Sequence, residues 1–207
     1  GEDKIIINEV HKASVRQFSR QIYSRIQNKN CPSCGMTEGY SDEHLWFNVG
    51  KNFVDKDTNG DNVGYKYDPT SLAIGYDHDL IPNALNIGIA FSYAFGEVKG
   101  KGKNIYNTAD IDEYMLSLYW KYKPLRAYMT GSVGGGYMNS DSKVRGSSID
   151  VRGDSDTRAA FINTEFGYDF GNACGVFEPF VGFEYAYIYN KAYTEKGLGA
   201  RHFASSY

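Results

Sequence analysis

Large apolar residues and small or polar residues alternate strictly over residues 85–96. The odd positions hold six large side chains: Leu85, Ile87, Ile89, Phe91, Tyr93 and Phe95. The even positions hold Asn86, Gly88, Ala90, Ser92, Ala94 and Gly96. Successive side chains of a β-strand point to opposite faces of the sheet. The segment therefore predicts a strand with one hydrophobic face of large side chains and one face of small or polar side chains. A lipid-facing exterior and a wet lumen require that arrangement, as in a membrane barrel.

The same alternation recurs along the rest of the chain. It predicts further strands at residues 44–53, 65–77, 110–122, 125–137, 160–170 and 177–189, and part of an eighth at 197–203. Asp68-Pro69 interrupts the second strand, as a β-bulge does.

The links between these strands alternate in length. Tight links at 79–83, 123–124 and 171–174 are interleaved with long, polar links at 55–64, 97–109 and 139–156. Outer-membrane barrels have short periplasmic turns and long external loops. We therefore expect a membrane barrel whose first strand begins on the periplasmic side.

A helix is predicted before the strands, over residues 8–27. Val15, Phe18, Ile22 and Ile26 recur there at spacings of three and four, which is typical of one helix face. Lys12, Arg16 and Arg20 repeat every four residues on another side. Periodicity alone favours an amphipathic surface helix. We assign residues 1–30 to the helix, 31–43 to a linker and 44–207 to the barrel.

Composition agrees with a barrel. The chain of 207 residues holds 18 Tyr, 12 Phe and 23 Gly, and its mean hydropathy is -0.49. No run of eighteen apolar residues occurs, which excludes a bundle of transmembrane helices. A net charge of -3 provides no basic field, so nucleic acid is not an expected partner. Residues 1–7 lack the features of a secretory signal peptide, so we expect a mature or excised piece of an outer-membrane protein.

Several short motifs resemble functional sites but favour ordinary structural roles. Cys31-Pro-Ser-Cys34 lacks further ligands at a spacing that supports zinc, which favours a disulfide or an incidental pair and leaves Cys174 over. Residues 55–61 match half of a calcium loop, but Lys66 stands where its glutamate belongs. Residues 152–154, Arg-Gly-Asp, are expected in a solvated turn of the longest loop. With no nucleophile and base at a supporting spacing, we expect no enzyme activity, cofactor or metal.

The opening of the barrel resembles a known family. A helix, a linker and then Leu45-Trp-Phe-Asn-Val-Gly50 look like the translocator domain of type V autotransporters. Residues 67–77, 87–93 and 178–185 resemble the second, third and seventh strands of that family.

The resemblance implies a fold and a function. The fold would be an all-β, transmembrane, antiparallel up-and-down barrel of twelve strands with the helix in its lumen. Such a domain lies in the bacterial outer membrane and carries an upstream passenger to the cell surface. Its partners would be outer-membrane lipid, its own passenger and the barrel-assembly machinery. Because seven to eight strands are counted here, we expect a translocator truncated at its C-terminus.

A helix in a polar lumen predicts contacts between opposite charges. The basic residues of the helix are Lys12, Arg16, Arg20 and Arg25. The inward-facing acids are Asp77, Glu165, Asp169, Glu178 and Glu184. In a wet lumen such pairs would each contribute about 1 kcal/mol or less, so they would position the helix more than stabilise it. Some family members also release the passenger at an Asn in this helix. Asn8 is the candidate, although helix capping is the favoured role.

Two other classes remain open. A complete eight-stranded outer-membrane barrel of the small adhesin or membrane-anchor type would have an interior filled by side chains, without space for a helix. A soluble ligand-binding barrel would refold without detergent. Inward glycines such as Gly88, Gly96 and Gly167 favour a lumen with room, and thus the translocator.

Overall fold

Among the residues that it describes, the computed structural model shows one helix and one antiparallel sheet. It describes residues 2–27, 39–41, 44–51, 54–57, 64–101, 106–145, 150–171, 177–190, 193–196 and 202–203. The elements are α1 (Glu2–Gln27), β1 (Gly39–Ser41), β2 (Leu45–Lys51), β3 (Val54–Lys56), β4 (Tyr65–Tyr67), β5 (Thr70–Ile81), β6 (Leu85–Gly100), β7 (Tyr106–Tyr122), β8 (Ala127–Arg145), β9 (Asp150–Tyr168), β10 (Phe180–Asn190), β11 (Tyr193–Lys196) and β12 (His202–Phe203). Within the described part of the chain, no helix is long and apolar enough to cross a membrane.

Neighbouring strands follow the order of the chain. The sheet runs β1-β2-β5-β6-β7-β8-β9-β11-β12, with β10 paired to β9 and the β3–β4 hairpin joined to β6. Each described pair is antiparallel. The all-β, up-and-down prediction is confirmed, and each of the seven full strands predicted from the sequence is present. The predicted break at Asp68-Pro69 separates β4 from β5.

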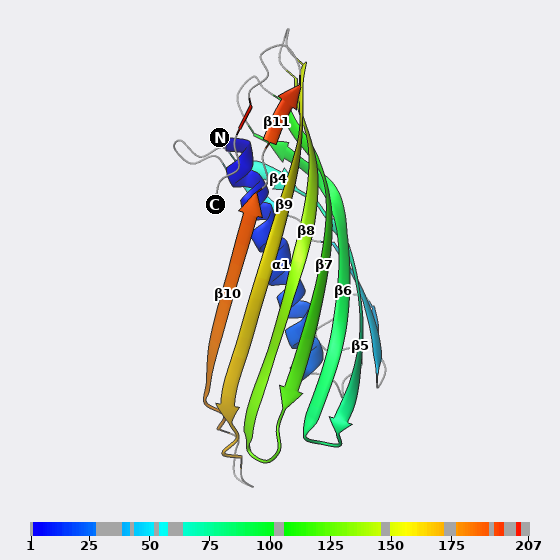
Figure 1. Cartoon of the computed structure of the whole chain (residues 1–207), viewed down its shortest axis with the longest axis vertical. Coiled ribbons are helices and arrows are strands. Elements are labelled where there is room, and N and C mark those ends of the chain that lie inside the picture. The colour runs from blue at the N-terminus through cyan, green and yellow to red at the C-terminus, as the bar shows by residue number, and fades with distance from the viewer. Residues whose placement is uncertain are drawn as a thin grey trace.

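The sheet curves around the helix. Figure 1 shows α1 against the concave side of the strands, inclined along β7 and β8. Among the described residues, no ladder joins β10 or β12 to β1 or β2. Residues 181–187 of β10 are exposed at every position, because no further strand or helix covers them in the described structure.

The two faces of the sheet carry different side chains, as the alternation of large apolar and small residues predicts. Ile87, Ile89 and Phe91 on the convex face are 40%, 45% and 42% exposed. The intervening Ala90 and Ser92 are buried on the concave face. Large apolar side chains therefore face outward and small ones face the helix, which is the reverse of a soluble protein and the pattern of a membrane barrel.

The outward apolar band has a sharp edge. Tyr93, Tyr114 and Tyr137 lie opposite one another on β6, β7 and β8. In the next row outward along the strands, Phe95 of β6 is followed by Asp112, Asn139 and Asp156 on β7, β8 and β9. The hydroxyls of Tyr93 and Tyr137 donate hydrogen bonds to Asp112 and Asp156 at 2.8 Å. Aromatic side chains followed by charges are typical of the membrane–water boundary.

Beyond this edge, strands replace part of the predicted loops. β8 continues to Arg145 and β9 begins at Asp150, so the prediction of a loop over 139–156 is wrong. Residues 152–154 lie in β9, paired with β8 and β11, and not in a turn. Backbone hydrogen bonds between strands form regardless of side-chain polarity, so polar residues beyond the membrane do not end the ladder.

The N-terminal elements also differ from the predictions. α1 begins at Glu2, six residues before the expected start, so the capping role favoured for Asn8 is wrong. An N-cap lies at the first turn of a helix, and Asn8 lies inside this one. The expected linker at 31–43 contains β1, which pairs with β2. Cys31, Cys34 and Cys174 lie outside the described residues.

Candidate functional site: the helix in the concave face

The helix holds the sheet through an apolar stripe. Val15, Phe18, Ile22 and Ile26 are buried in one cluster with concave-face residues, and Val10 belongs to a second cluster. The rings of Phe18 and Phe161 meet edge to face, with centroids 6.2 Å apart and planes at 84°. Burial of these side chains is the main contribution to docking of the helix, since each removes a large apolar area from water.

One buried ion pair fixes the end of the helix. Arg25 Nε donates to Asp77 Oδ2 at 2.7 Å, and its Nη2 donates to Oδ1 at 3.1 Å. Both side chains are 1% exposed. A bidentate pair of this kind imposes one geometry on its partners. Because either charge alone would be costly in this setting, the pair specifies where α1 ends on β5.

Two aromatic residues extend the ion pair across the sheet. The Tyr119 hydroxyl donates to Asp77 Oδ2 at 2.7 Å, and Trp46 Nε1 donates to the Tyr119 oxygen at 2.9 Å. Asp77 is on β5, Tyr119 on β7 and Trp46 on β2. This chain, which we call the Arg25 network, links the helix to three strands within the sheet. Every member is buried.

Glycines make room for the network. A Cβ on Gly75 would lie 2.2 Å from the indole of Trp46, and a Cβ on Gly88 would lie 2.1 Å from the ring of Tyr119. The two aromatic rings therefore lie directly on the glycine backbone of the neighbouring strand. The concave face needs small residues here so that large rings can lie flat beneath the helix.

Further polar contacts orient the helix along the strands. Lys121 Nζ donates to the carbonyl of Ile26 at 3.3 Å, a favourable interaction at a helix C-terminus. The hydroxyl of Tyr65 donates to Glu9 Oε2 at 3.5 Å. Lys121 adjoins the β7–β8 turn, whereas Tyr65 pairs with Gly100 near the opposite end of β6. The C-terminus of α1 thus lies at the tight-turn end of the sheet and its N-terminal half lies toward the extended strands (Figure 1).

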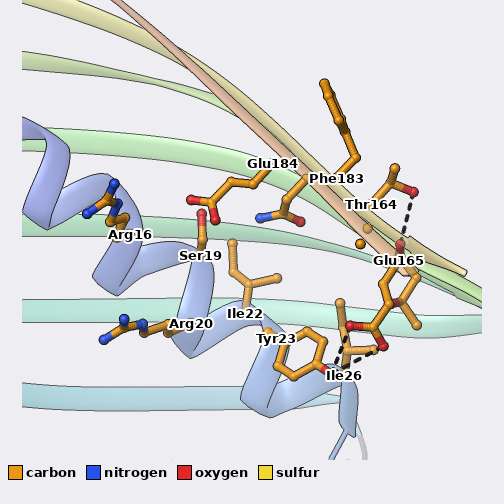
Figure 2. Close-up of a pocket in the computed structure, with 14 residues that line it drawn as sticks. Arg16, Ser19, Arg20, Ile22, Tyr23, Ile26, Thr164, Glu165, Phe183 and Glu184 are labelled. Atoms are coloured by element: carbon orange, nitrogen blue, oxygen red, sulfur yellow. Dashed lines mark hydrogen bonds between the residues drawn. The ribbon is translucent and has the colours of Figure 1, made fainter. Parts of the chain in front are cut away.

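Glu165 meets the helix through a hydroxyl. Tyr23 donates to both carboxylate oxygens of Glu165, at 3.2 and 3.3 Å, and Tyr128 donates to Oε1 at 3.2 Å. These bonds bridge α1, β8 and β9, and Figure 2 shows Tyr23 and Glu165 together near one side of a cavity.

The cavity lies between the helix and the edge of the sheet at β10. It has a volume of about 630 Å³, and Arg16, Arg20, Glu165 and Glu184 contribute to its lining. Figure 2 shows Arg16 and Arg20 extending from α1 on the side away from Glu165. Lys12, Arg16 and Arg20 are exposed and form no ion pair with the described residues. The basic face of the helix is therefore directed away from its docked face.

The remaining acidic candidates lie elsewhere. Asp169 pairs with Lys123 at 3.3 Å beyond the end of the helix, and the backbone amide of Gly171 donates to it. Glu178 is exposed before β10 begins. Of the charged set expected in the lumen, the structure brings Arg25 and Asp77 into an ion pair and places Arg16, Arg20, Glu165 and Glu184 around one cavity.

A second buried polar contact lies nearer the N-terminus of the helix and was missed from the sequence. His11 Nδ1 lies 3.7 Å from Glu113 Oε1, and both side chains are fully buried. Neither has a hydrogen-bond partner in the described structure. The only signal in the sequence was Glu113 at an inward position of its strand, between Ile111 and Met115.

Asp55 and Asp57, the first two acidic residues of the half calcium loop, both contact a lysine. The ammonium group of Lys101 contacts the carboxylates of both Asp55 and Asp57. The Lys101 hydrogen bond holds the pKa of Asp55 below its usual range. Among the described residues, no group of three or more His, Cys, Asp or Glu side chains is arranged for a metal ion. The concave face thus offers shape and charge to bind a helix.

Comparison with protein families agrees with this architecture. The sequence model of the family described as Autotransporter beta-domain matches residues 45–207, which span every described strand except β1. No curated protein and no solved structure matches the chain. The family is one of outer-membrane translocator barrels, and the matched segment covers well over half of the chain. The chain therefore belongs to the autotransporter β-domain family.

Proposed function

We propose that this chain is the part of an autotransporter that anchors the protein in the bacterial outer membrane and carries an upstream passenger to the cell surface. The observation that carries the proposal is the docked helix: α1 is buried against the concave face while the convex face presents an apolar band. After an upstream passenger has crossed the barrel, the segment that joins it to the first strand would lie within the pore. Its partners would be outer-membrane lipid, the passenger and the barrel-assembly machinery.

The direction of the helix supports this role. Its C-terminus lies at the tight-turn end of the sheet, and its N-terminal half lies toward the extended, charged strand ends. Short turns face the periplasm in outer-membrane barrels. A passenger that precedes Glu2 would consequently emerge at the external end, while the strands that follow the helix begin at the periplasmic end.

The packing of the helix favours this proposal over the small eight-stranded barrel. In that class the interior is filled by side chains from the strands. Here Phe18 and Ile22 of α1 occupy the interior and pack with Phe161. The outward apolar band likewise disfavours a soluble ligand-binding barrel, which would expose mainly polar side chains.

Protease treatment of intact cells that express the full-length protein tests the transport role. We expect the passenger to be cleaved by external protease while residues 44–207 remain in the outer-membrane fraction. A passenger that is protected in intact cells and digested only after the outer membrane is opened would contradict the proposal.

We also propose that the passenger stays attached at Asn8. Release would require the Asn8 side-chain nitrogen to attack the backbone carbonyl carbon of Asn8 and break the peptide bond to Glu9, which leaves as the amine. Inside a helix, that backbone carbonyl oxygen accepts the backbone amide four residues later. Intact mass of the protein extracted from outer membranes should therefore show one chain that includes Asn8. A separate barrel fragment that begins at Glu9, and that disappears in Asn8→Ala, would contradict attachment.

A further inference from the structure

Two histidines lie side by side at the tight-turn end of the sheet, outside the helix site. His44 directly precedes β2, and His78 is an exposed residue of β5. Their ring centroids are 5.3 Å apart with an interplanar angle of 42°. Neither residue takes part in the Arg25 network, and His78 lies on the opposite face of β5 from Asp77.

We propose that His44 and His78 form a surface site for one divalent transition-metal ion of the kind that prefers imidazole, such as Zn²⁺ or Cu²⁺, with water completing the coordination. Imidazole nitrogen is a favoured ligand of these ions and a poor ligand for Mg²⁺ or Ca²⁺. The site is independent of the transport role, because it needs only the pairing of β2 with β5.

The distance between the rings fits a shared ion. With metal–nitrogen bonds of about 2.0–2.1 Å, each ring centroid would lie about 3.2 Å from the metal, and a tetrahedral angle would separate two centroids by about 5.2 Å. The observed separation is 5.3 Å. A coordinated pair therefore requires rotation of the His78 ring but no displacement of the strands.

The tautomer of His44 is also the one that a ligand needs. Its Nδ1 lies 3.1 Å from the carbonyl oxygen of Asp77. Because a carbonyl oxygen can only accept, Nδ1 carries the proton and the lone pair of the neutral ring is on Nε2. Metal-binding histidines commonly donate their second ring nitrogen to a backbone carbonyl in this way.

The backbone holds the two residues in place. The amide of Asp77 donates to the carbonyl of His44 at 2.9 Å, and the β2–β5 ladder continues from Leu45↔Tyr76. The Tyr76 ring is tilted against His44, with centroids 6.0 Å apart. One imidazole is thus fixed from two sides, and the other projects beside it from a regular strand.

Calorimetry with Zn²⁺ on the full chain in detergent, without a histidine tag, tests the proposal. Cys31, Cys34 and Cys174 are replaced by Ser so that thiolates cannot bind the ion. We expect one Zn²⁺ per chain, affinity lower by at least about tenfold in His78→Ala, and no binding in the double alanine variant. Mg²⁺ should not bind, and acidification should weaken Zn²⁺ binding because the metal competes with protons for imidazole.

Two matched variants keep the result interpretable. His44→Asn retains a donor for the Asp77 carbonyl but lacks the Nε2 ligand, so it should fold and lose affinity. His202→Ala removes a histidine at another place in the chain and should bind as the parent does. Electron paramagnetic resonance of the Cu²⁺ form should show two nitrogen ligands. Absence of binding in the parent, or binding that survives the double alanine variant, would overturn the proposal.

Discussion

At the scale of single residues, the fold depends on buried charged groups and aromatic rings, which fit because neighbouring strand positions hold glycine. Asp77 accepts from Arg25 and Tyr119, and Tyr119 accepts from Trp46. The sequence predicts Arg25 and Asp77 as members of two charged sets, but not as partners. Pairing requires the register of β2, β5 and β7, which are far apart in sequence and meet only in the folded sheet.

Asp77→Ala should destabilise the folded barrel strongly. The substitution leaves the Arg25 guanidinium buried without its carboxylate, a situation that costs about 3–5 kcal/mol. The loss should appear as a lower temperature at which the purified protein changes its mobility in SDS gels. The double variant Arg25→Met/Asp77→Leu removes both charges and should recover most of the lost stability. Equal destabilisation in the single and double variants would contradict a pairing role.

Gly88→Ala tests the fit of Tyr119. Its Cβ would lie 2.1 Å from the Tyr119 ring, so the ring must shift and its hydrogen bond to Asp77 should weaken. Overpacking of this kind costs about 1–3 kcal/mol. Gly182→Ala is the matched control, because the nearest atom to its Cβ is the Thr164 carbonyl oxygen at 3.8 Å. Denaturant unfolding should separate the two variants, and equal stability would refute the close packing.

At the scale of elements, alternation was the reliable signal and loop polarity was not. The strand at 85–96 could be read from the sequence because its two faces differ at every position. The polar segment at 139–145 also alternates, with Met138 and Ser140 buried and Asn139 and Asp141 exposed. Its polarity suggested a loop, whereas its position opposite β7 and β9 makes it a strand. Ladder pairing is a long-range property that local composition does not encode.

The extended strands carry a testable pH effect. A hydrogen bond that the protonated Asp141 side chain donates to the neighbouring Asp154 carboxylate, together with partial desolvation, raises the pKa of Asp141 above its usual value. The folded protein therefore holds this proton more tightly than the unfolded chain, so stability from this group is present at low pH and is lost as pH rises through the folded pKa. Carboxyl carbon NMR should show a lower Asp141 pKa in Asp154→Ala. An unchanged pKa would exclude the carboxyl–carboxyl contact.

At the scale of the whole molecule, an apolar convex face surrounds a helix that the concave face binds. The apolar side of α1 packs against residues of β2, β5, β6, β7 and β9, whereas its basic side, with Arg16 and Arg20, borders the cavity next to β10. The sequence predicted the helix and its two faces. Which face docks could not be predicted, because a lumen-filling helix and a surface helix share the same periodicity.

Reversing Arg16 and Arg20 to Glu should loosen the helix within the pore. The new carboxylates would border the cavity that Glu165 and Glu184 line, and like charges repel at that range. We expect barrel assembly to persist and the conductance of single pores in planar bilayers to rise. Lys12→Glu reverses the charge at one position outside the cavity lining and should leave conductance near that of the parent. Unchanged conductance in the double variant would contradict the helix as a plug.

Crosslinking in outer membranes tests the central claim most directly. Gln21 Nε2 donates to Asn48 Oδ1 at 3.4 Å, whereas Phe47 lies on the opposite, exposed face of β2. In full-length protein lacking its native cysteines, the pair Gln21→Cys/Asn48→Cys should be joined by a short bifunctional maleimide and migrate faster in gels. Gln21→Cys/Phe47→Cys should not be joined. No crosslink in the first pair within the outer-membrane fraction, or equal crosslinking in both pairs, would contradict a helix held inside a membrane barrel.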